Sequence, residues 1–238
     1  MLYETLLIIS AYLVGSIPLG YTVARLVGGI NLREYGTGNV GASNVYRNVG
    51  KGPAVLVAVG DIVKGLWPVV LARYLNWSDT VVALAGLAAI VGYDWPIFTR
   101  FKGGRGLAAS IGACAPLLLS WFVLLAVAFV VGSAIKRVAV FMIVTFAVLP
   151  VFLWWEGQSP ALIAMGVAVW LLLLVRRLDG IGEDLLLHQN KTRIIADRLL
   201  FDHRPGQRLT GHIASQSKSG RTDVAKNSPG PTAPGISS

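Results

Sequence analysis

The stretch "LAASIGACAPLLLSWFVLLAVAFVVGSAI", Leu107–Ile135, is the longest apolar run of the chain and contains no charged side chain. It exceeds the roughly 20 apolar residues that a helix needs to cross the hydrocarbon core of a bilayer. Pro116 lies inside it, and a proline within a helix loses a backbone hydrogen bond and clashes with the preceding turn. We therefore expect a short helix and a longer one, divided near Pro116 and embedded in a membrane.

The same apolar character extends over most of the chain on both sides of this run. Hydrophobic residues make up 54% of the 238 residues and charged residues only 14%, whereas soluble domains carry about 25% charged residues. The composition predicts an all-α, polytopic integral membrane protein with about seven transmembrane helices. Besides the two helices just described, the expected spans are residues 2–26, residues 53–75, a span ending near Phe98, one ending at Trp155 and one ending at Val175.

The basic residues gather at alternate ends of these spans. Cytoplasmic loops of membrane proteins carry an excess of Lys and Arg, so we expect the N-terminus outside and the C-terminus in the cytoplasm. This placement explains the formal net charge of +9 without a nucleic acid partner. The basic residues on the expected cytoplasmic side are Arg25, Arg33, Arg47, Lys51, Arg100, Lys102, Arg105, Lys136, Arg137, Arg176 and Arg177, whereas Glu4, Arg73, Asp79 and Glu156 lie on the other side.

The two ends of the chain and its single cysteine limit the kinds of site and segment that the chain can contain. The start of the chain lacks a basic region and carries Glu4, so we interpret it as the first transmembrane helix and not as a cleaved signal. Cys114 is the only cysteine, which excludes an intrachain disulfide and a cysteine-ligated metal site, and no ligand cluster suggests a metal or an organic cofactor. We expect a transmembrane domain over residues 1–177, a cytoplasmic amphipathic segment over 178–204 and a disordered tail, rich in Gly, Pro, Ser and Thr, over 205–238.

The first of two polar loops contains "GTGNVG", Gly36–Gly41, which satisfies the pattern G-x-G-x-x-G. A dinucleotide site requires this pattern between a strand and a helix of a parallel α/β unit. Here an apolar helix precedes it, so we reject that interpretation. The glycines still allow successive backbone N–H groups to face one concavity, which binds anions, and nearby arginines add positive charge.

The second polar loop, "KGGRG" at Lys102–Gly106, leads into the helix that begins at Leu107. The N–H groups and the dipole at the start of a helix also favour an anion. Two such cradles on one membrane face suggest phosphorylated ligands. The alternative is that both loops are ordinary cytoplasmic connectors.

Ionisable residues within and beyond the spans supply two further observations. Asp61 and Lys64 are three residues apart and share one face of a helix. Ionisable groups within a span usually line a polar interior. The alternative is a structural salt bridge between the two side chains.

All three histidines, His188, His203 and His212, follow the last span. A membrane-embedded Ser-His-Asp triad is therefore excluded, and none of the three has the His-x-x-x-x-Asp spacing of the large acyltransferase family.

Three motifs, in this order, resemble those of the bacterial acyl-phosphate:glycerol-3-phosphate acyltransferases, the PlsY family. They are "GSIPLGYTVARLVGGINLREYGTGNVGASNVYRNVGKG" at Gly15–Gly52, "DIVKG" at Asp61–Gly65 and "GYDWPIFTRFKGGRGLA" at Gly92–Ala108. The resemblance implies an integral enzyme of the bacterial inner membrane, with seven helices and its motifs facing the cytoplasm. It also implies transfer of a fatty acyl group from acyl phosphate to glycerol 3-phosphate, which gives lysophosphatidic acid and needs no cofactor.

Site residues follow from matching these motifs. The resemblance implies that Arg47 and Lys102 neutralise phosphate charge and that Asn44 acts with them. Acyl phosphate is already activated, so no protein nucleophile is needed, and a substrate phosphate can accept the hydroxyl proton. The residues expected to bind substrate are Ser16, Gly36, Thr37, Gly38, Asn39, Gly41, Ser43, Gly103, Gly104 and Arg105.

The chain also departs from the family pattern. Tyr93 stands where the second motif usually has histidine, Arg105 stands where it usually has lysine, and the expected Ser-rich loop reads "SAIKRVAV" at Ser133–Val140. The histidine and asparagine that usually follow the last span occur only later, as His188 and Asn190. The alternatives are therefore a paralogue of the same fold with altered or lost activity, or a small transporter for an anionic solute. The sequence does not predict the acyl-chain preference or the oligomeric state.

Overall fold

The computed structural model describes residues 1–117, 119–135 and 137–178, and every regular element within them is helical. The expected all-α fold is thus confirmed. His188, Asn190, the disordered tail expected over residues 205–238 and all but the first residue of the amphipathic segment expected over 178–204 lie outside the described residues. The elements are α1 (Leu2–Gly15), α2 (Leu19–Gly28), η1 (Leu32–Glu34), α3 (Ala42–Asn48), α4 (Lys51–Tyr74), α5 (Asp79–Asp94), η2 (Ile97–Thr99), α6 (Leu107–Cys114), α7 (Leu119–Ala134), α8 (Val138–Trp155) and α9 (Pro160–Leu178).

Several of these helical stretches are long and apolar enough to cross a membrane. They are Leu2–Gly28, Lys51–Tyr74, Asp79–Thr99 and Pro160–Leu178, and α7 and α8 add shorter apolar helices. Large apolar side chains such as Leu56 and Val130 point outward and are more than half exposed, at 63% and 66%. A helix that is apolar on its outer face as well suits lipid as its surroundings, so the chain is a multi-pass membrane protein.

Two helix breaks determine how the apolar runs fold. The break expected near Pro116 is confirmed, because α6 ends at Cys114 and α7 begins at Leu119. The span expected over residues 2–26 is confirmed as a helical stretch, but it is not one continuous helix. The chain leaves helical geometry between α1 and α2, and Pro18 precedes the first residue of α2. Proline lacks an N–H group and disfavours helical geometry in the residue before it, which explains the break.

Small residues set the closest helix contact, between α4 and α6. A Cβ atom added at Gly65 of α4 would overlap the Ala109 carbonyl group, and one added at Gly112 of α6 would overlap the Ile62 carbonyl group. Small residues allow such close backbone approach in membranes, where packing takes the place of the hydrophobic effect. The short helix α6 is thereby fixed against the middle of α4.

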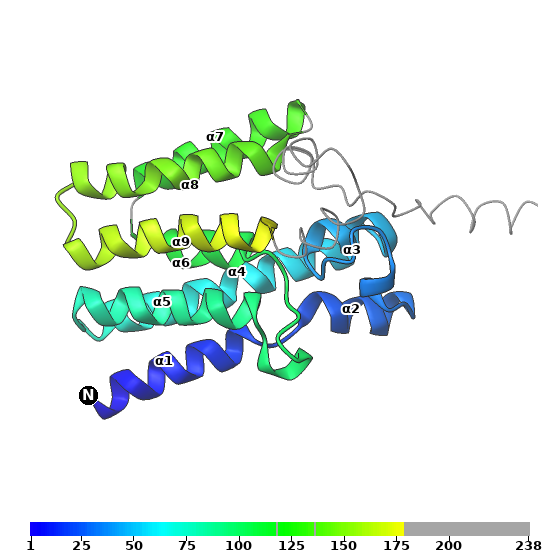
Figure 1. Ribbon diagram of the computed structural model, residues 1–238, viewed down its shortest axis with the longest axis horizontal. Coiled ribbons are helices and arrows are strands. Elements are labelled where there is room, and N and C mark those ends of the chain that lie inside the picture. Colours follow the sequence, from blue (N-terminus) through cyan, green and yellow to red (C-terminus); the bar gives the residue numbers. More distant parts are fainter. Residues whose placement is uncertain (118, 136, 179–238) are drawn as a thin grey trace, which may run out of the picture. The chain divides into compact units, whose positions relative to one another are not determined.

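The remaining helices extend the bundle from this pair. Helix α7 lies beside α8, α8 beside α9, and α9 beside α5 (Figure 1). Helices α2 and α3 contact α4 at the end of the bundle that also carries the segment between α5 and α6 (Figure 1). Both polar glycine-rich loops therefore lie at the same end of the membrane-embedded helices.

Candidate active site

Asn44 organises the first polar loop from within. Its side chain is 1% exposed, and its Nδ2 atom lies 3.2, 3.0 and 2.8 Å from the carbonyl oxygens of Leu32, Tyr35 and Asn39. Its Oδ1 atom accepts a hydrogen bond of 3.3 Å from the backbone N–H of Thr37. One side chain thus satisfies backbone groups along the whole turn.

This role explains one glycine of the "GTGNVG" pattern. Gly36 has a φ of 56°, in the left-handed region that favours glycine. A Cβ atom at Gly36 would overlap the Asn44 side chain and lie 2.9 Å from that of Asn48. The N–H of Thr37 is occupied by Asn44, so this part of the loop holds a side chain where the sequence suggested an anion.

The outer surface of the first loop carries its exposed polar groups. Ser43 and Arg47 lie on α3 and are both exposed, and Arg47 is in the last turn of this helix. Asn39 and Gly38 are half-buried. The side of the loop that can meet a ligand is therefore the α3 side, where the positive charge is.

The second polar loop lies across the end of α5. The N–H of Gly104 donates to the Tyr93 carbonyl group at 3.3 Å, and a Cβ atom at Gly104 would overlap the Tyr93 ring. A Cβ atom at Gly103 would overlap the Tyr93 carbonyl group as well. These glycines therefore serve close packing, whereas Lys102 is exposed and Arg105 is half-buried.

The start of α6 faces an acidic side chain of the protein itself. Gly106 precedes α6 with a φ of 67°, and a Cβ atom there would lie 2.7 and 3.0 Å from the two carboxylate oxygens of Asp94. Asp94 is fully buried. The position expected to favour an anionic ligand is thus next to a carboxylate.

The structure brings the two polar loops together at two points. The Arg33 guanidinium donates to the Lys102 carbonyl oxygen at 2.6 Å. The Tyr93 hydroxyl lies between the loops, because a Cβ atom at Gly41 would be 3.5 Å from it and a Cβ atom at Gly104 only 2.6 Å. Tyr93 and Arg33 therefore connect the motifs that the sequence placed on one face.

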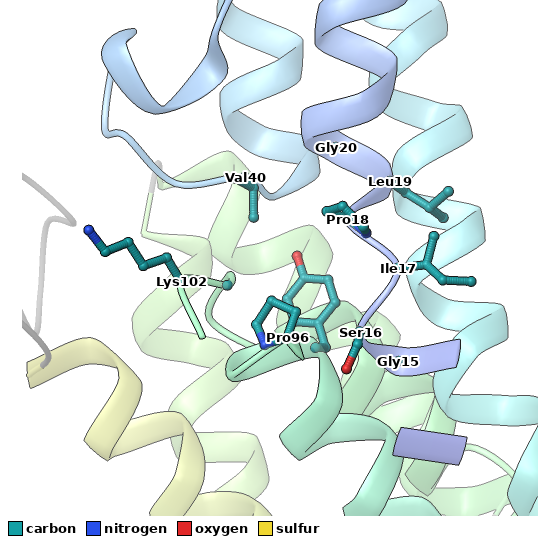
Figure 2. A pocket seen from close by; sticks show the side chains of 11 residues that line it. Gly15, Ser16, Ile17, Pro18, Leu19, Gly20, Val40, Pro96 and Lys102 are labelled. Atoms are coloured by element: carbon teal, nitrogen blue, oxygen red, sulfur yellow. The ribbon is translucent and has the colours of Figure 1, made fainter. Parts of the chain in front are cut away.

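A small pocket lies where these loops meet the break between α1 and α2 (Figure 2). One side of it is apolar and includes Ile17, Pro18 and Leu19 (Figure 2). Lys102 lies at the rim, where its exposed side chain extends away from the other lining residues (Figure 2). An apolar lining with a cation at its rim suits a ligand with a charged end and an oily one. Of the residues expected from the sequence, the pocket is lined by Ser16, Tyr93, Lys102 and Gly103.

The Asp61–Lys64 pair lies behind this pocket. Lys64 Nζ is 3.0 Å from Asp61 Oδ1, and the two side chains are 5% and 1% exposed. The same ammonium group donates to the Ile17 carbonyl oxygen, at the break between α1 and α2, and lies 5.6 Å from the centre of the Tyr93 ring. These contacts support the structural interpretation, in which the pair ties α4 to the backbone that lines the pocket.

Sequence reasoning missed one polar contact of this site. Arg176, at the end of α9, donates from Nε and from a terminal nitrogen to the Gly104 carbonyl oxygen. The sequence suggested only a basic residue that ends the last span. The signal was Asp94, an aspartate within an apolar span that has no basic residue three or four positions away along its helix.

Comparison with known proteins identifies the family of this chain. The family model described as glycerol-3-phosphate acyltransferase matches residues 5–184. The glycerol-3-phosphate acyltransferase of Synechococcus sp. (strain CC9902) is 40% identical over 185 residues, covering 76% of this chain and 92% of that protein. The protein of the same name from Geobacter sulfurreducens is 37% identical over 186 residues, covering 76% and 93%.

Solved structures give the same result. A crystal structure of PlsY, an integral membrane glycerol 3-phosphate acyltransferase, in its glycerol 3-phosphate form superposes with a TM-score of 0.70 at 31% identity, covering 79% of this chain and 94% of that one. Its lysophosphatidic acid form gives 0.68 at 30% identity, covering 82% and 98%. The family model and these relatives show that the chain belongs to the glycerol-3-phosphate acyltransferase family.

Proposed function

We propose that this protein transfers a fatty acyl group from acyl phosphate to glycerol 3-phosphate and releases lysophosphatidic acid and phosphate. The observation that carries the proposal is the junction of two polar loops, with exposed Arg47 and Lys102, at one end of an apolar helix bundle. The proposal is supported by the two solved relatives, which are described as the glycerol 3-phosphate and lysophosphatidic acid forms.

The reaction requires orientation and charge stabilisation but no covalent intermediate. The primary hydroxyl of glycerol 3-phosphate attacks the acyl carbonyl carbon, an ester C–O bond forms, and the bond between that carbon and the phosphate oxygen breaks. The hydroxyl proton passes to a phosphate oxygen of a substrate. Holding the hydroxyl against the carbonyl and stabilising the departing phosphate supply the rate enhancement.

Each part of the site has a place in this scheme. Lys102 neutralises phosphate charge at the pocket, and Arg47 does so from α3. Asn39 and Ser43 orient the phosphate, and Asn44 acts through the loop geometry that it holds. Of the other residues expected to bind substrate, Ser16 and Gly103 line the pocket, whereas Gly36, Thr37, Gly38, Gly41, Gly104 and Arg105 belong to the loops that shape it.

The apolar wall of the pocket suits the other end of the donor. Ile17, Pro18 and Leu19 line the pocket, so the oily chain of an acyl phosphate can lie against them while its phosphate meets the exposed Lys102 at the rim. Membrane lipid surrounds the remaining helices. The Lys and Arg distribution supports a bacterial inner membrane location with both loops facing the cytoplasm.

The test is acyl transfer by purified protein in detergent, with labelled glycerol 3-phosphate. We expect product with acyl phosphate and none with acyl-CoA or acyl carrier protein. Equal use of acyl-CoA would contradict the proposed donor. A folded protein that is inert with every donor would instead identify a paralogue that has lost the activity, and Tyr93→His would then show whether the unusual tyrosine is the cause.

A further inference from the structure

Arg176 joins the last helix to the second polar loop. It lies in the last turn of α9 and is buried, with 7% of its surface exposed. Its Nε atom donates to the Gly104 carbonyl oxygen at 3.0 Å, and one of its terminal nitrogens donates to the same oxygen at 2.8 Å. Two N–H groups of a charged side chain on one carbonyl oxygen make a strong and directional contact.

Two neighbours at the end of α5 hold this guanidinium in place. Arg176 Nε lies 4.0 Å from Asp94 Oδ1, and the Asp94 side chain is fully buried. The Arg176 guanidinium carbon lies 5.0 Å from the centre of the Trp95 ring, a cation–π distance. A buried cation needs a nearby counter-charge, and Asp94 supplies it from the helix end over which the loop is laid.

The part of the loop that Arg176 contacts is close to Lys102 along the chain. Gly104 is two residues from Lys102, and its own N–H bonds to the Tyr93 carbonyl group at 3.3 Å. The Lys102 carbonyl oxygen is fixed in turn by Arg33 at 2.6 Å and by the Thr99 hydroxyl at 3.0 Å. Arg176 and the Tyr93 carbonyl group therefore both hold the Gly104 end of this segment.

We propose that Arg176, paired with Asp94, is a positioning residue that fixes the second polar loop and with it the phosphate-binding Lys102. This inference rests on the proposed function for the role of Lys102 in binding phosphate. The hydrogen bonds by which Arg176 holds the loop do not depend on that function. Arg176 does not touch substrate in this scheme. It acts by keeping the loop, and with it the backbone that carries Lys102, in one conformation.

The contact is tested first without any assay of activity, by hydrogen–deuterium exchange of the amides in residues 99–107. The N–H groups of Phe101, Lys102 and Gly104 are hydrogen-bonded to backbone oxygens and report loop opening. We expect Arg176→Gln to raise exchange of the Gly104 amide by about 10- to 100-fold, the effect of losing a charged hydrogen bond. Arg73→Gln, which removes an exposed arginine of α4, is the matched control and should change nothing here.

The second test separates positioning from general damage. A loop that reaches its binding conformation in only a fraction of molecules weakens apparent binding by that fraction, so Arg176→Gln should raise the KM for a phosphorylated substrate about tenfold and lower kcat by less than about threefold. Arg176→Lys keeps the charge and one donor nitrogen, so its KM should lie between those of wild type and Arg176→Gln. A protein that is merely less well folded would lose kcat at an unchanged KM.

The outcomes distinguish this inference from the proposed function. Unchanged exchange in residues 99–107 of a folded Arg176→Gln variant, or an unchanged KM beside a reduced kcat, would overturn the positioning role. If Arg176→Gln fails to fold, Arg176→Lys carries both measurements, with a smaller expected change. If wild-type protein shows no acyl transfer, the proposed function fails, and the exchange result still decides whether Arg176 fixes the loop.

Discussion

Replacing Asn44 by alanine tests whether one buried amide holds the first polar loop. The side chain offers two N–H groups to the carbonyl groups of Leu32, Tyr35 and Asn39, and it accepts hydrogen bonds from the Thr37 N–H and from Asn48. At most four of these hydrogen bonds are complete at one time, because Nδ2 has two hydrogens. At about 1 kcal/mol net for each bond, Asn44→Ala destabilises the folded state by about 4 kcal/mol.

A loss of this size is readily measured. For a chain of this length it lowers Tm by about 10 °C, and thermal unfolding in detergent, followed by tryptophan fluorescence, is the assay. Asn48→Ala removes two hydrogen bonds to Asn44 and should lower Tm by about half of that. Ser43→Ala, an exposed change on the same helix, should leave Tm unaltered.

The same variants separate stability from catalysis. Because the loop carries the exposed charge of Arg47, Asn44→Ala should also abolish acyl transfer at temperatures well below its Tm. If Asn44→Ala unfolds within about 2 °C of wild type, the amide does not hold the loop. If the variant is folded, as stable as wild type and fully active, Asn44 neither stabilises the first polar loop nor contributes to catalysis through the geometry of that loop.

Three further changes test other parts of the structure. Lys102→Ala removes an exposed charge, so acyl transfer, measured as kcat/KM, should fall about 100-fold while Tm stays constant. Gly65→Ala places a Cβ atom onto the Ala109 carbonyl group and should cost about 1–3 kcal/mol in thermal unfolding, whereas Gly52→Ala, which meets nothing within 4 Å, should not. Lys64→Met leaves Asp61 buried without its cation and should destabilise the folded state by about 3–5 kcal/mol. Adding Asp61→Leu should recover most of this loss. A double variant as unstable as the single one would contradict the interpretation of Asp61 and Lys64 as a structural salt bridge.

Much of the helical architecture could be predicted, because apolar composition is local information. The expected spans appear as helices, except that the first is divided into α1 and α2, and Pro116 marked a break correctly. Pro18 is an equally clear signal, yet the apolar run continues through it, and composition alone did not show that the backbone turns there. A prediction based on hydropathy averages over such a short interruption.

The segments that form the site could be predicted from the sequence, but the contacts between them could not. The two loops were visible as glycine-rich polar segments, and the structure brings them together. The inward orientation of Asn44 was not predictable, because the same residue type serves equally well as a ligand contact on an exposed surface. The contact between Arg176 and Gly104 spans 72 residues, and no sequence spacing encodes it.

The shortness of α6 has a consequence for the membrane itself. Its eight residues measure about 12 Å at 1.5 Å per residue, less than half of a hydrocarbon core of about 30 Å. At least one end of α6 must therefore lie below the level of the headgroups, where irregular backbone is tolerated only if protein surrounds it. Ala109, Ala113 and Cys114 of α6 are buried, so the neighbouring helices supply those surroundings and lipid does not.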